Sequence, residues 1–139
     1  MSADEFVDTN ILVYAFDRTA GAKRDVAAEL LTRLSSDRVG CTSIQVLQEF
    51  YVNVTKKQGM SSVEASAQVS RLGKWKVHRP GANDVLLAIR LHRDKSVSFW
   101  DAMILRSAMS CDCSVLWSED LSNGQVWSGL TVRNPFARR

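Results

Sequence analysis

Short apolar segments alternate with longer amphipathic segments along most of the chain, and this alternation restricts the possible fold more than any other feature. The short segments are typical of buried strands, whereas apolar residues repeated at helical spacing predict helices. The predicted strands cover residues 6–7, 39–41, 76–78, 114–117 and 130–133. The predicted helices cover residues 10–16, 23–35, 42–54, 61–72, 84–93 and 98–109.

For two of the predicted helices, the spacing of the apolar residues also predicts which side chains form the apolar side. Residues 42–45, Thr-Ser-Ile-Gln, resemble a capping box that begins the third helix. The apolar side of this helix is predicted to hold Ile44, Leu47, Phe50, Tyr51 and Val54. The helix over residues 84–93 is predicted to place Val85, Ala88, Ile89 and His92 on one side.

Strands that alternate with helices indicate an α/β fold with a parallel sheet covered on both faces. In such sheets, ligands bind beyond the carboxyl ends of the strands, near the point where the strand order reverses. A carboxylate that directly follows a strand is therefore a candidate for chemistry. The sequence has no internal repeat, low-complexity tract or linker, so we expect one domain over residues 1–139.

Composition excludes several other classes of protein. No apolar run reaches the roughly 18 residues that span a bilayer, and the acidic N-terminus does not resemble a signal peptide. We therefore expect a cytoplasmic protein without a membrane partner. The three cysteines (41, 111 and 113) are an odd number that nothing pairs into a disulfide framework, and the spacing of Cys111 and Cys113 is not that of a zinc site. We interpret all three as reduced thiols.

Four carboxylates occupy positions where a parallel sheet would place a site. Asp8 directly follows the first strand, Asp120 follows the strand that ends at residue 117, and Glu49 lies on the helix after the second strand. Each also has an ordinary interpretation: a helix cap for Asp8, a polar turn for Asp120 and a solvent-facing residue for Glu49. Asn10 is a secondary candidate beside Asp8.

Asp101 is the most informative of these residues. The positions three, four and seven residues later are Ile104, Leu105 and Ala108, so its carboxylate lies at the edge of an apolar face. A carboxylate near a core needs a partner or a metal ion. It could also belong to the cap of its helix, because it lies three residues after Ser98. Oxygen ligands without histidine or cysteine suit magnesium or manganese.

The sequence resembles the PIN-domain ribonucleases, especially the VapC-like toxins of bacterial toxin–antitoxin pairs. The resemblance covers nearly the whole chain and rests on the order and spacing of its segments. These are Phe6-Val7-Asp8-Thr9-Asn10, Glu49-Phe50-Tyr51, Ser98-Phe99-Trp100-Asp101-Ala102, Leu116-Trp117-Ser118-Glu119-Asp120-Leu121 and Asn134-Pro135-Phe136.

The resemblance implies a three-layer α/β/α sandwich with a short, mostly parallel central sheet. It implies that Asp8, Glu49, Asp101 and Asp120 are the acidic residues that hold Mg²⁺, with Mn²⁺ as a substitute. Ser118 is the hydroxyl neighbour of the fourth acid, and Glu119 is a second acid at that place. The implied partners are an RNA substrate, a second copy of the chain and an antitoxin that blocks the site.

The chemistry of such a cluster requires no side-chain nucleophile. Metal ions lower the pKa of bound water and neutralise charge on a phosphate. Without metal, four clustered carboxylates repel one another, and at least one pKa should rise. Removing these four acids from the count leaves 18 basic against 11 acidic residues, a basic surface that suits a phosphodiester substrate. Arg93 and Lys95 are among the residues that could bind phosphate, although they could equally be solvated.

Three other functions compete with this prediction. A haloacid-dehalogenase-like phosphatase usually needs a second aspartate two residues after the first, where this chain has Asn10. A non-catalytic PIN-like binding module would have lost ligand carboxylates, but all four are present. A PIN-domain nuclease of RNA processing or turnover, without a toxin role, remains open.

Overall fold

A six-stranded sheet forms the centre of the structure, with the strand order β3-β2-β1-β4-β6-β5. The computed structural model describes residues 3–137, so the outermost ends of the predicted domain, residues 1–2 and 138–139, lie outside the described residues. The strands are β1 (Glu5–Val7), β2 (Gly40–Ser43), β3 (Lys76–His78), β4 (Val115–Trp117), β5 (Val126–Trp127) and β6 (Leu130–Arg133). All neighbouring pairs are parallel except β5 and β6.

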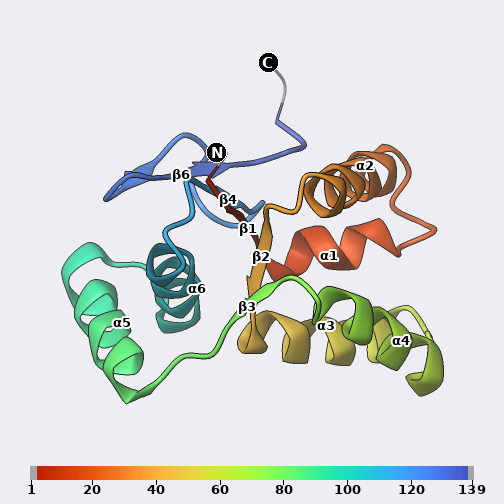
Figure 1. Cartoon of the computed structure of the whole chain (residues 1–139), viewed down its shortest axis with the longest axis horizontal. Coiled ribbons are helices and arrows are strands. Elements are labelled where there is room, and N and C mark those ends of the chain that lie inside the picture. Colours follow the sequence, from red (N-terminus) through yellow and green to blue (C-terminus); the bar gives the residue numbers. More distant parts are fainter. Residues whose placement is uncertain (1–2, 138–139) are drawn as a thin grey trace.

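Helices cover both faces of this sheet. They are α1 (Thr9–Ala15), α2 (Ala22–Ser36), α3 (Ile44–Lys57), α4 (Ser62–Leu72), α5 (Ala82–Lys95) and α6 (Phe99–Ser110). Figure 1 shows α5 and α6 on one side of the sheet and α1 to α4 on the other. The predicted fold, a mostly parallel sheet between helices, is confirmed.

The order of the strands reverses beside β1. The chain first builds β1, β2 and β3 outward in one direction, then returns to the other side of β1 with β4. Loops that leave β1 and β4 at their carboxyl ends therefore diverge, and ligands of parallel sheets bind at such a point. The sequence places Asp8 directly after β1 and Ser118 directly after β4.

The short strands are buried because helices cover both of their faces. Phe6 and Val7 of β1 are completely covered, as are Ile11 and Leu12 of α1. Burial on both faces explains why β1 appears in the sequence as an apolar run rather than as an alternating pattern. These side chains belong to the main hydrophobic core, which also contains the three cysteines as free thiols.

The start and the buried side of α3 differ from the prediction. Ser43, not Thr42, is the N-cap, and its Oγ accepts a hydrogen bond from the Val46 backbone. The Thr42 hydroxyl instead donates to the Val7 carbonyl at 3.3 Å, which links β2 to β1. The buried residues of α3 are Val46, Phe50 and Val54, whereas Leu47 is only partly buried and Tyr51 is exposed. The helix is thus rotated toward Val46 relative to the prediction.

Two further features differ from the sequence prediction. The two-residue strand β5 was not predicted, because it is too short to show a periodic pattern. It forms a hairpin with β6 through Ser128 and Gly129, both of which have positive φ, as a tight hairpin turn requires. On α5 only Ala88 is buried, while Val85 and Ile89 of the predicted apolar side are exposed.

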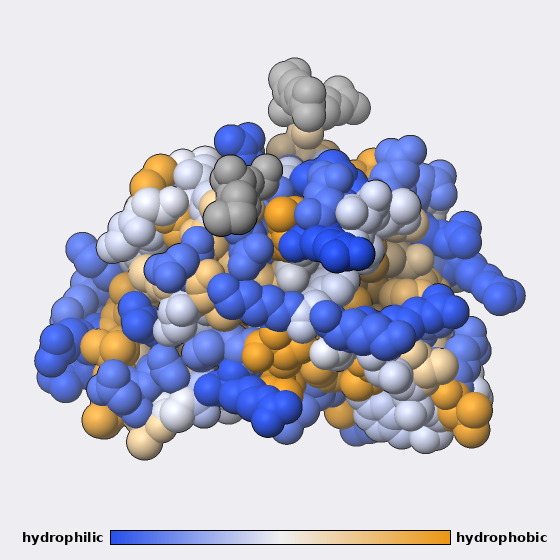
Figure 2. All heavy atoms as spheres, in the orientation of Figure 1, coloured by the Kyte–Doolittle hydropathy of each residue, from blue (hydrophilic) through white to orange (hydrophobic). Residues whose placement is uncertain are grey.

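The surface contains polar and apolar areas side by side. On the face shown in Figure 2, hydrophilic residues cover most of the surface, and hydrophobic atoms form small separated patches. Within residues 3–137, no helix combines the length and hydrophobicity that crossing a membrane requires.

Candidate active site

Asp8 lies between the carboxyl ends of β1 and β4, where the strand order reverses. Val7 is paired in register with Trp117, so Asp8 and Ser118 are the first residues beyond the two strands. The Ser118 hydroxyl donates to Asp8 Oδ2 at 2.8 Å, and the Thr9 backbone N–H donates to Oδ1 at 2.7 Å. Asp8 is therefore the N-cap of α1 and also a link between β1 and β4.

The environment of Asp8 disfavours its charged form. Its side chain is buried, and its pKa is raised from the ordinary 3.8 to about 6, with burial as the largest cause. The carboxylates of Asp120 and Glu49 also contribute to this rise, whereas the hydrogen bonds from Ser118 and Thr9 oppose it. Such shifts are common where proteins bind cations or carry out acid–base chemistry.

The Glu49 carboxylate accepts two hydrogen bonds, one of which comes from α1. The Thr9 hydroxyl donates to Oε2 at 2.8 Å, and the Gln45 amide, one turn earlier on α3, donates to Oε1 at 2.8 Å. Glu49 is half-buried rather than fully exposed to solvent. Because Thr9 follows Asp8 directly, this contact connects the start of α3 to the start of α1.

Ser118 connects Asp8 to Asp120. Its side chain is completely buried, and its Oγ accepts a hydrogen bond from the Asp120 backbone N–H at 3.2 Å while donating to Asp8. The Asp120 side chain is exposed, yet its charge acts on Asp8. The short turn after β4 thus places a second carboxylate near the first.

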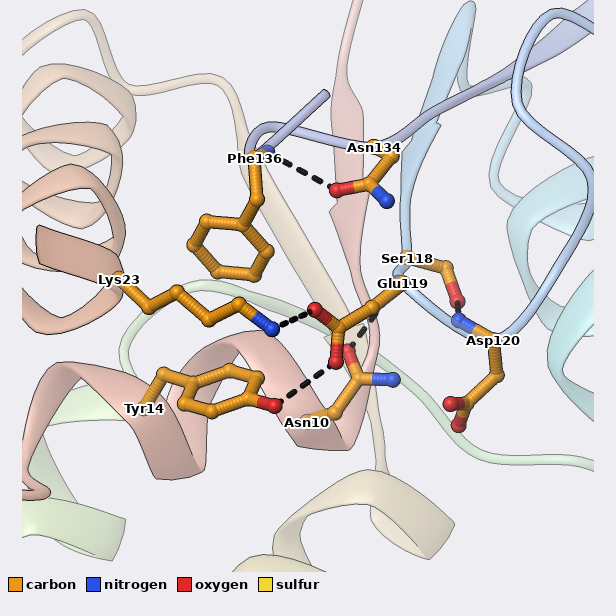
Figure 3. A network of polar contacts seen from close by, with 8 residues as sticks. All are labelled: Asn10, Tyr14, Lys23, Ser118, Glu119, Asp120, Asn134 and Phe136. Atoms are coloured by element: carbon orange, nitrogen blue, oxygen red, sulfur yellow. Dashed lines mark hydrogen bonds and ion pairs between the residues drawn. The ribbon is translucent and has the colours of Figure 1, made fainter. Parts of the chain in front are cut away.

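Glu119 lies between Ser118 and Asp120 but belongs to a different network. Figure 3 shows its carboxylate directed toward Tyr14 and Lys23, away from the Asp120 carboxylate. The Tyr14 hydroxyl donates to Glu119 Oε1 at 2.8 Å, and Lys23 forms an ion pair with Oε2. The Lys23 ammonium also lies 5.0 Å from the centre of the Tyr14 ring and 5.3 Å from that of Phe136.

This network keeps Glu119 ionised. Partial burial alone would raise the pKa of its carboxyl, but the hydrogen bonds from Lys23 and Tyr14 outweigh burial and hold the pKa below its ordinary value. Because Glu119 is already paired with the Lys23 ammonium, it is poorly suited to bind a metal ion as well. Of the two adjacent acids, Asp120 is the one whose charge acts on Asp8.

Asn10 lies at the inner edge of the same network. Its Oδ1 accepts a long hydrogen bond of 3.5 Å from the Glu119 backbone N–H. Its Nδ2 is buried and has no hydrogen-bond partner within residues 3–137. In Figure 3 this nitrogen points to the side on which Asp120 lies. An unpaired buried donor is costly, so this position favours an acceptor from outside the chain.

The direction of α6 is fixed by its contacts with β3. His78, the last residue of β3, contacts the Ser107 hydroxyl through Nδ1 at 2.9 Å. Lys76, two residues earlier in the strand, donates to the Cys111 carbonyl at 3.3 Å. The helix therefore runs opposite to the strands, and its first turn lies on the side of their carboxyl ends.

Asp101 is in this first turn, at the same edge of the sheet as Asp8, beyond the carboxyl ends of the strands. It is half-buried, and its backbone N–H donates to the Ser98 hydroxyl at 3.1 Å, which confirms the predicted cap. Unlike Glu49 and Asp120, it is not among the charges that act on Asp8. Its carboxylate has no hydrogen-bond partner within the described part of the chain.

The four predicted acids thus divide into three that are connected through Asp8 and its hydrogen-bonding neighbours, and one, Asp101, that is not. Glu49 and Asp120 act electrostatically on Asp8, and Asp101 lies at the same edge of the sheet, in the first turn of α6. Among residues 3–137, no three carboxylate, thiol or imidazole side chains are already placed so that they could hold a metal ion together.

Three residues of the site were not identified from the sequence. Gln45 lies four residues before Glu49 on one helix, a spacing that could have suggested their hydrogen bond. Tyr14 and Lys23 carried no such signal, because their contacts with Glu119 join residues about a hundred positions apart.

Comparison with known proteins places this arrangement in a family. The sequence matches the family model of the PIN domain over residues 6–122. No match was found among curated proteins. The structure is similar to that of VapC20 from Mycobacterium tuberculosis, described as a sarcin–ricin loop cleaving toxin, with 22% identity and a TM-score of 0.66. The similarity covers 84% of this chain and 90% of VapC20.

Two further solved structures share the fold. A toxin–antitoxin complex from Klebsiella pneumoniae has a chain that is 20% identical, with a TM-score of 0.71 and coverage of 97% of this chain and 98% of that one. PAE2754 from Pyrobaculum aerophilum is 20% identical, with a TM-score of 0.55 and coverage of 86% and 82%, respectively. The family match spans most of the sequence and agrees with the resemblance noted from its motifs. The chain therefore belongs to the PIN-domain family.

Proposed function

We propose that this protein is a metal-dependent endoribonuclease and the toxin of a toxin–antitoxin pair. The observation that carries the proposal is the buried Asp8, whose carboxylate lies at the point of strand reversal with Asp120 and Glu49 close enough to raise its pKa. Membership of the PIN-domain family supports nuclease chemistry. The similarity to VapC20 and to the Klebsiella toxin–antitoxin complex supports the toxin role.

The donor atoms of the site fit Mg²⁺ better than a transition metal. All four predicted ligands offer carboxylate oxygen, and Asp8 gains from any cation that offsets its burial. Mg²⁺ keeps several waters and usually binds through one or two carboxylates and the phosphates of its substrate.

In this proposal the residues have distinct roles. Asp8 and Asp101 are the principal metal ligands, and Glu49 and Asp120 complete the cluster and orient a water. The metal, when bound, lowers the pKa of water and offsets charge on the phosphate. Ser118 and Thr9 hold Asp8 and Glu49 in place. The unpaired Asn10 Nδ2 can donate to a phosphate oxygen or to a water.

Replacement of Asp8 by asparagine tests the chemistry. Asp8→Asn keeps the size of the side chain and removes its charge, so we expect metal-dependent RNA cleavage to be lost while the fold remains. Asp94→Asn is the matched control, because Asp94 is exposed on α5 and we expect full activity. Undiminished cleavage by Asp8→Asn, or by the wild type in excess chelator, would contradict the proposal.

A growth experiment tests the toxin role separately. Expression of the wild-type chain should slow bacterial growth, Asp8→Asn should not, and a small co-encoded antitoxin should restore growth. Normal growth with a protein that cleaves RNA in vitro would favour a role in RNA processing or turnover. We also propose a cytoplasmic homodimer, which size-exclusion chromatography with light scattering would test.

A further inference from the structure

Trp100 is a large aromatic residue that the fold leaves open to solvent. It is 64% exposed, whereas Phe99 beside it is only partly exposed and packs against a small core of Ala88, Ala102 and Met103. An indole this exposed gains little from the folding of the chain itself. Its position next to Asp101 makes it a candidate for contact with a ligand.

The first turn of α6 brings Trp100 to the same edge of the sheet as Asp8. This placement follows from the direction of the helix, which the contacts of His78 with Ser107 and of Lys76 with Cys111 fix. Trp100 therefore lies beyond the carboxyl ends of the strands. The Trp100 indole and the candidate active site therefore lie at the same edge of the sheet.

The neighbourhood of Trp100 restricts its motion. Ser98 caps the helix one residue before Phe99, and the Phe99 and Trp100 rings pack edge to face, with centres 5.0 Å apart and planes at 73°. His92 contacts the Val97 carbonyl, which fixes the loop between α5 and α6. The indole is thus held outward rather than free to fold back onto the helix.

Basic residues lie immediately before this loop. The last turn of α5 contains Arg93 and Lys95, both exposed, and only residues 96–98 separate α5 from α6. A positive segment next to an exposed aromatic ring is the combination with which proteins bind single-stranded nucleic acid, because phosphates contact the cations and bases stack on the ring.

We propose that Trp100 stacks against an unpaired base of single-stranded RNA next to the cleaved phosphodiester, and that Arg93 and Lys95 contact the adjacent backbone phosphates. The inference rests on the proposed nuclease function and adds a residue that selects unpaired RNA. Stacking does not depend on base identity, so Trp100 distinguishes single-stranded from double-stranded RNA rather than one base from another.

Binding measurements test the stacking without relying on cleavage. In the Asp8→Asn background, anisotropy of a labelled, unstructured oligoribonucleotide reports the Kd. Trp100→Ala should weaken binding by about 5- to 150-fold, the range for loss of one stacked base, and Trp100→Phe should recover part of the loss. An abasic ribose-phosphate strand of equal length should bind both proteins equally.

The control is Val126→Ala, which removes a side chain of nearly the same exposed fraction, 63%, from β5. It should leave the Kd unchanged. Equal RNA affinity of Trp100→Ala and its parent would overturn the inference, as would a loss that the abasic strand also shows. A shift of Trp100→Ala from dimer to monomer with unchanged RNA affinity would likewise overturn it, because the indole would then belong to a contact between subunits.

Cleavage assays separate this inference from the proposed function. With otherwise wild-type protein and Mg²⁺, Trp100→Ala should raise KM for unpaired RNA and leave kcat nearly unchanged, since stacking stabilises the bound substrate and the transition state equally. Absence of cleavage by the wild type would refute the nuclease function. Normal wild-type cleavage with unaltered KM for Trp100→Ala would refute only the stacking.

Discussion

The two sides of the candidate site are built differently. On the side of β1 and β4, Asp8 is buried and receives hydrogen bonds from Ser118 and Thr9. On the side of α6, the Asp101 carboxylate is half-exposed and has no hydrogen-bond partner in the described chain, and Trp100 beside it faces solvent. The side of β1 and β4 is therefore fixed by contacts within the fold, whereas the side chains on the α6 side remain available to bind a ligand.

Because of this difference, the negative charges of Asp8 and Asp101 have different effects on the stability of the fold. The charge of Asp8 opposes folding, because burial and two neighbouring carboxylates disfavour it. Asp101 lies in the first turn of a helix, where the helix dipole favours a negative charge. A cation should therefore stabilise the β1 and β4 side much more than the α6 side.

The largest expected effect comes from neutralising Asp8. Its pKa in the folded state, about 6, exceeds the ordinary 3.8, so the folded protein binds the proton more tightly than the unfolded chain. Stability without metal should thus fall as pH rises from about 4 to about 6 and stay low above that. The shift corresponds to about 3 kcal/mol, so Asp8→Asn should stabilise the metal-free protein by up to that amount at pH 8.

Urea denaturation at pH 8 and near pH 4 measures this effect. The stabilisation by Asp8→Asn should be present at pH 8 and nearly absent near pH 4. At the lower pH the Asp8 side chain of the folded wild type is protonated and therefore neutral, as the asparagine of the variant is. Added Mg²⁺ should narrow the difference at pH 8, because the wild type, which keeps the Asp8 carboxylate, gains more from the cation than the variant. A destabilised Asp8→Asn at pH 8 would mean that the hydrogen bonds of the carboxylate outweigh its burial.

How far this arrangement was predictable differs between the two sides. The strand ends that carry Asp8 and Asp120, and the cap that carries Asp101, are local features, and the sequence predicted them. The network around Glu119 depends on Tyr14 of α1 and Lys23 of α2, which lie about a hundred positions earlier in the sequence. No local pattern indicates such a contact. The same limit applies to the rotation of α3, because the packing of the helix, not its sequence, decides that Val46 is buried.

A smaller effect is expected from Thr9, which links the buried Asp8 to the half-buried Glu49. Thr9→Val keeps the shape of a buried side chain and removes the hydrogen bond to Glu49. We expect a loss of about 1.5 kcal/mol in the free energy of unfolding, the usual cost of leaving a charged acceptor unpaired. Thr9→Ser, which retains the hydroxyl, is the control for denaturation experiments. Equal stability of the valine and serine variants would show that the hydrogen bond from Thr9 to Glu49 does not stabilise the fold.

Glu119 should show the opposite pH dependence from Asp8, although only Ser118 separates it from β4. Its pKa lies below the ordinary value, so its contribution is present above that value and lost as pH falls through the lowered pKa. Glu119→Gln should cost about 1 kcal/mol at pH 7, because one partner, Lys23, is largely exposed, and little in acid. Denaturation at the two pH values measures this. A pH-independent cost would assign the effect to packing rather than to charge.

The smallest effect on stability is expected from Asp101→Asn, although Asp101 has the largest expected catalytic role on the α6 side of the site. Asp101→Asn keeps the Ser98 cap, which uses the backbone N–H, and loses only a favourable charge in the first turn of α6. The expected loss is about 0.5 kcal/mol, while RNA cleavage should disappear as completely as in Asp8→Asn. Denaturation and cleavage assays on the same preparation measure both. A stabilisation like that of Asp8→Asn would place Asp101 inside the repelling cluster and remove the distinction between the two sides, since both carboxylates would then oppose folding.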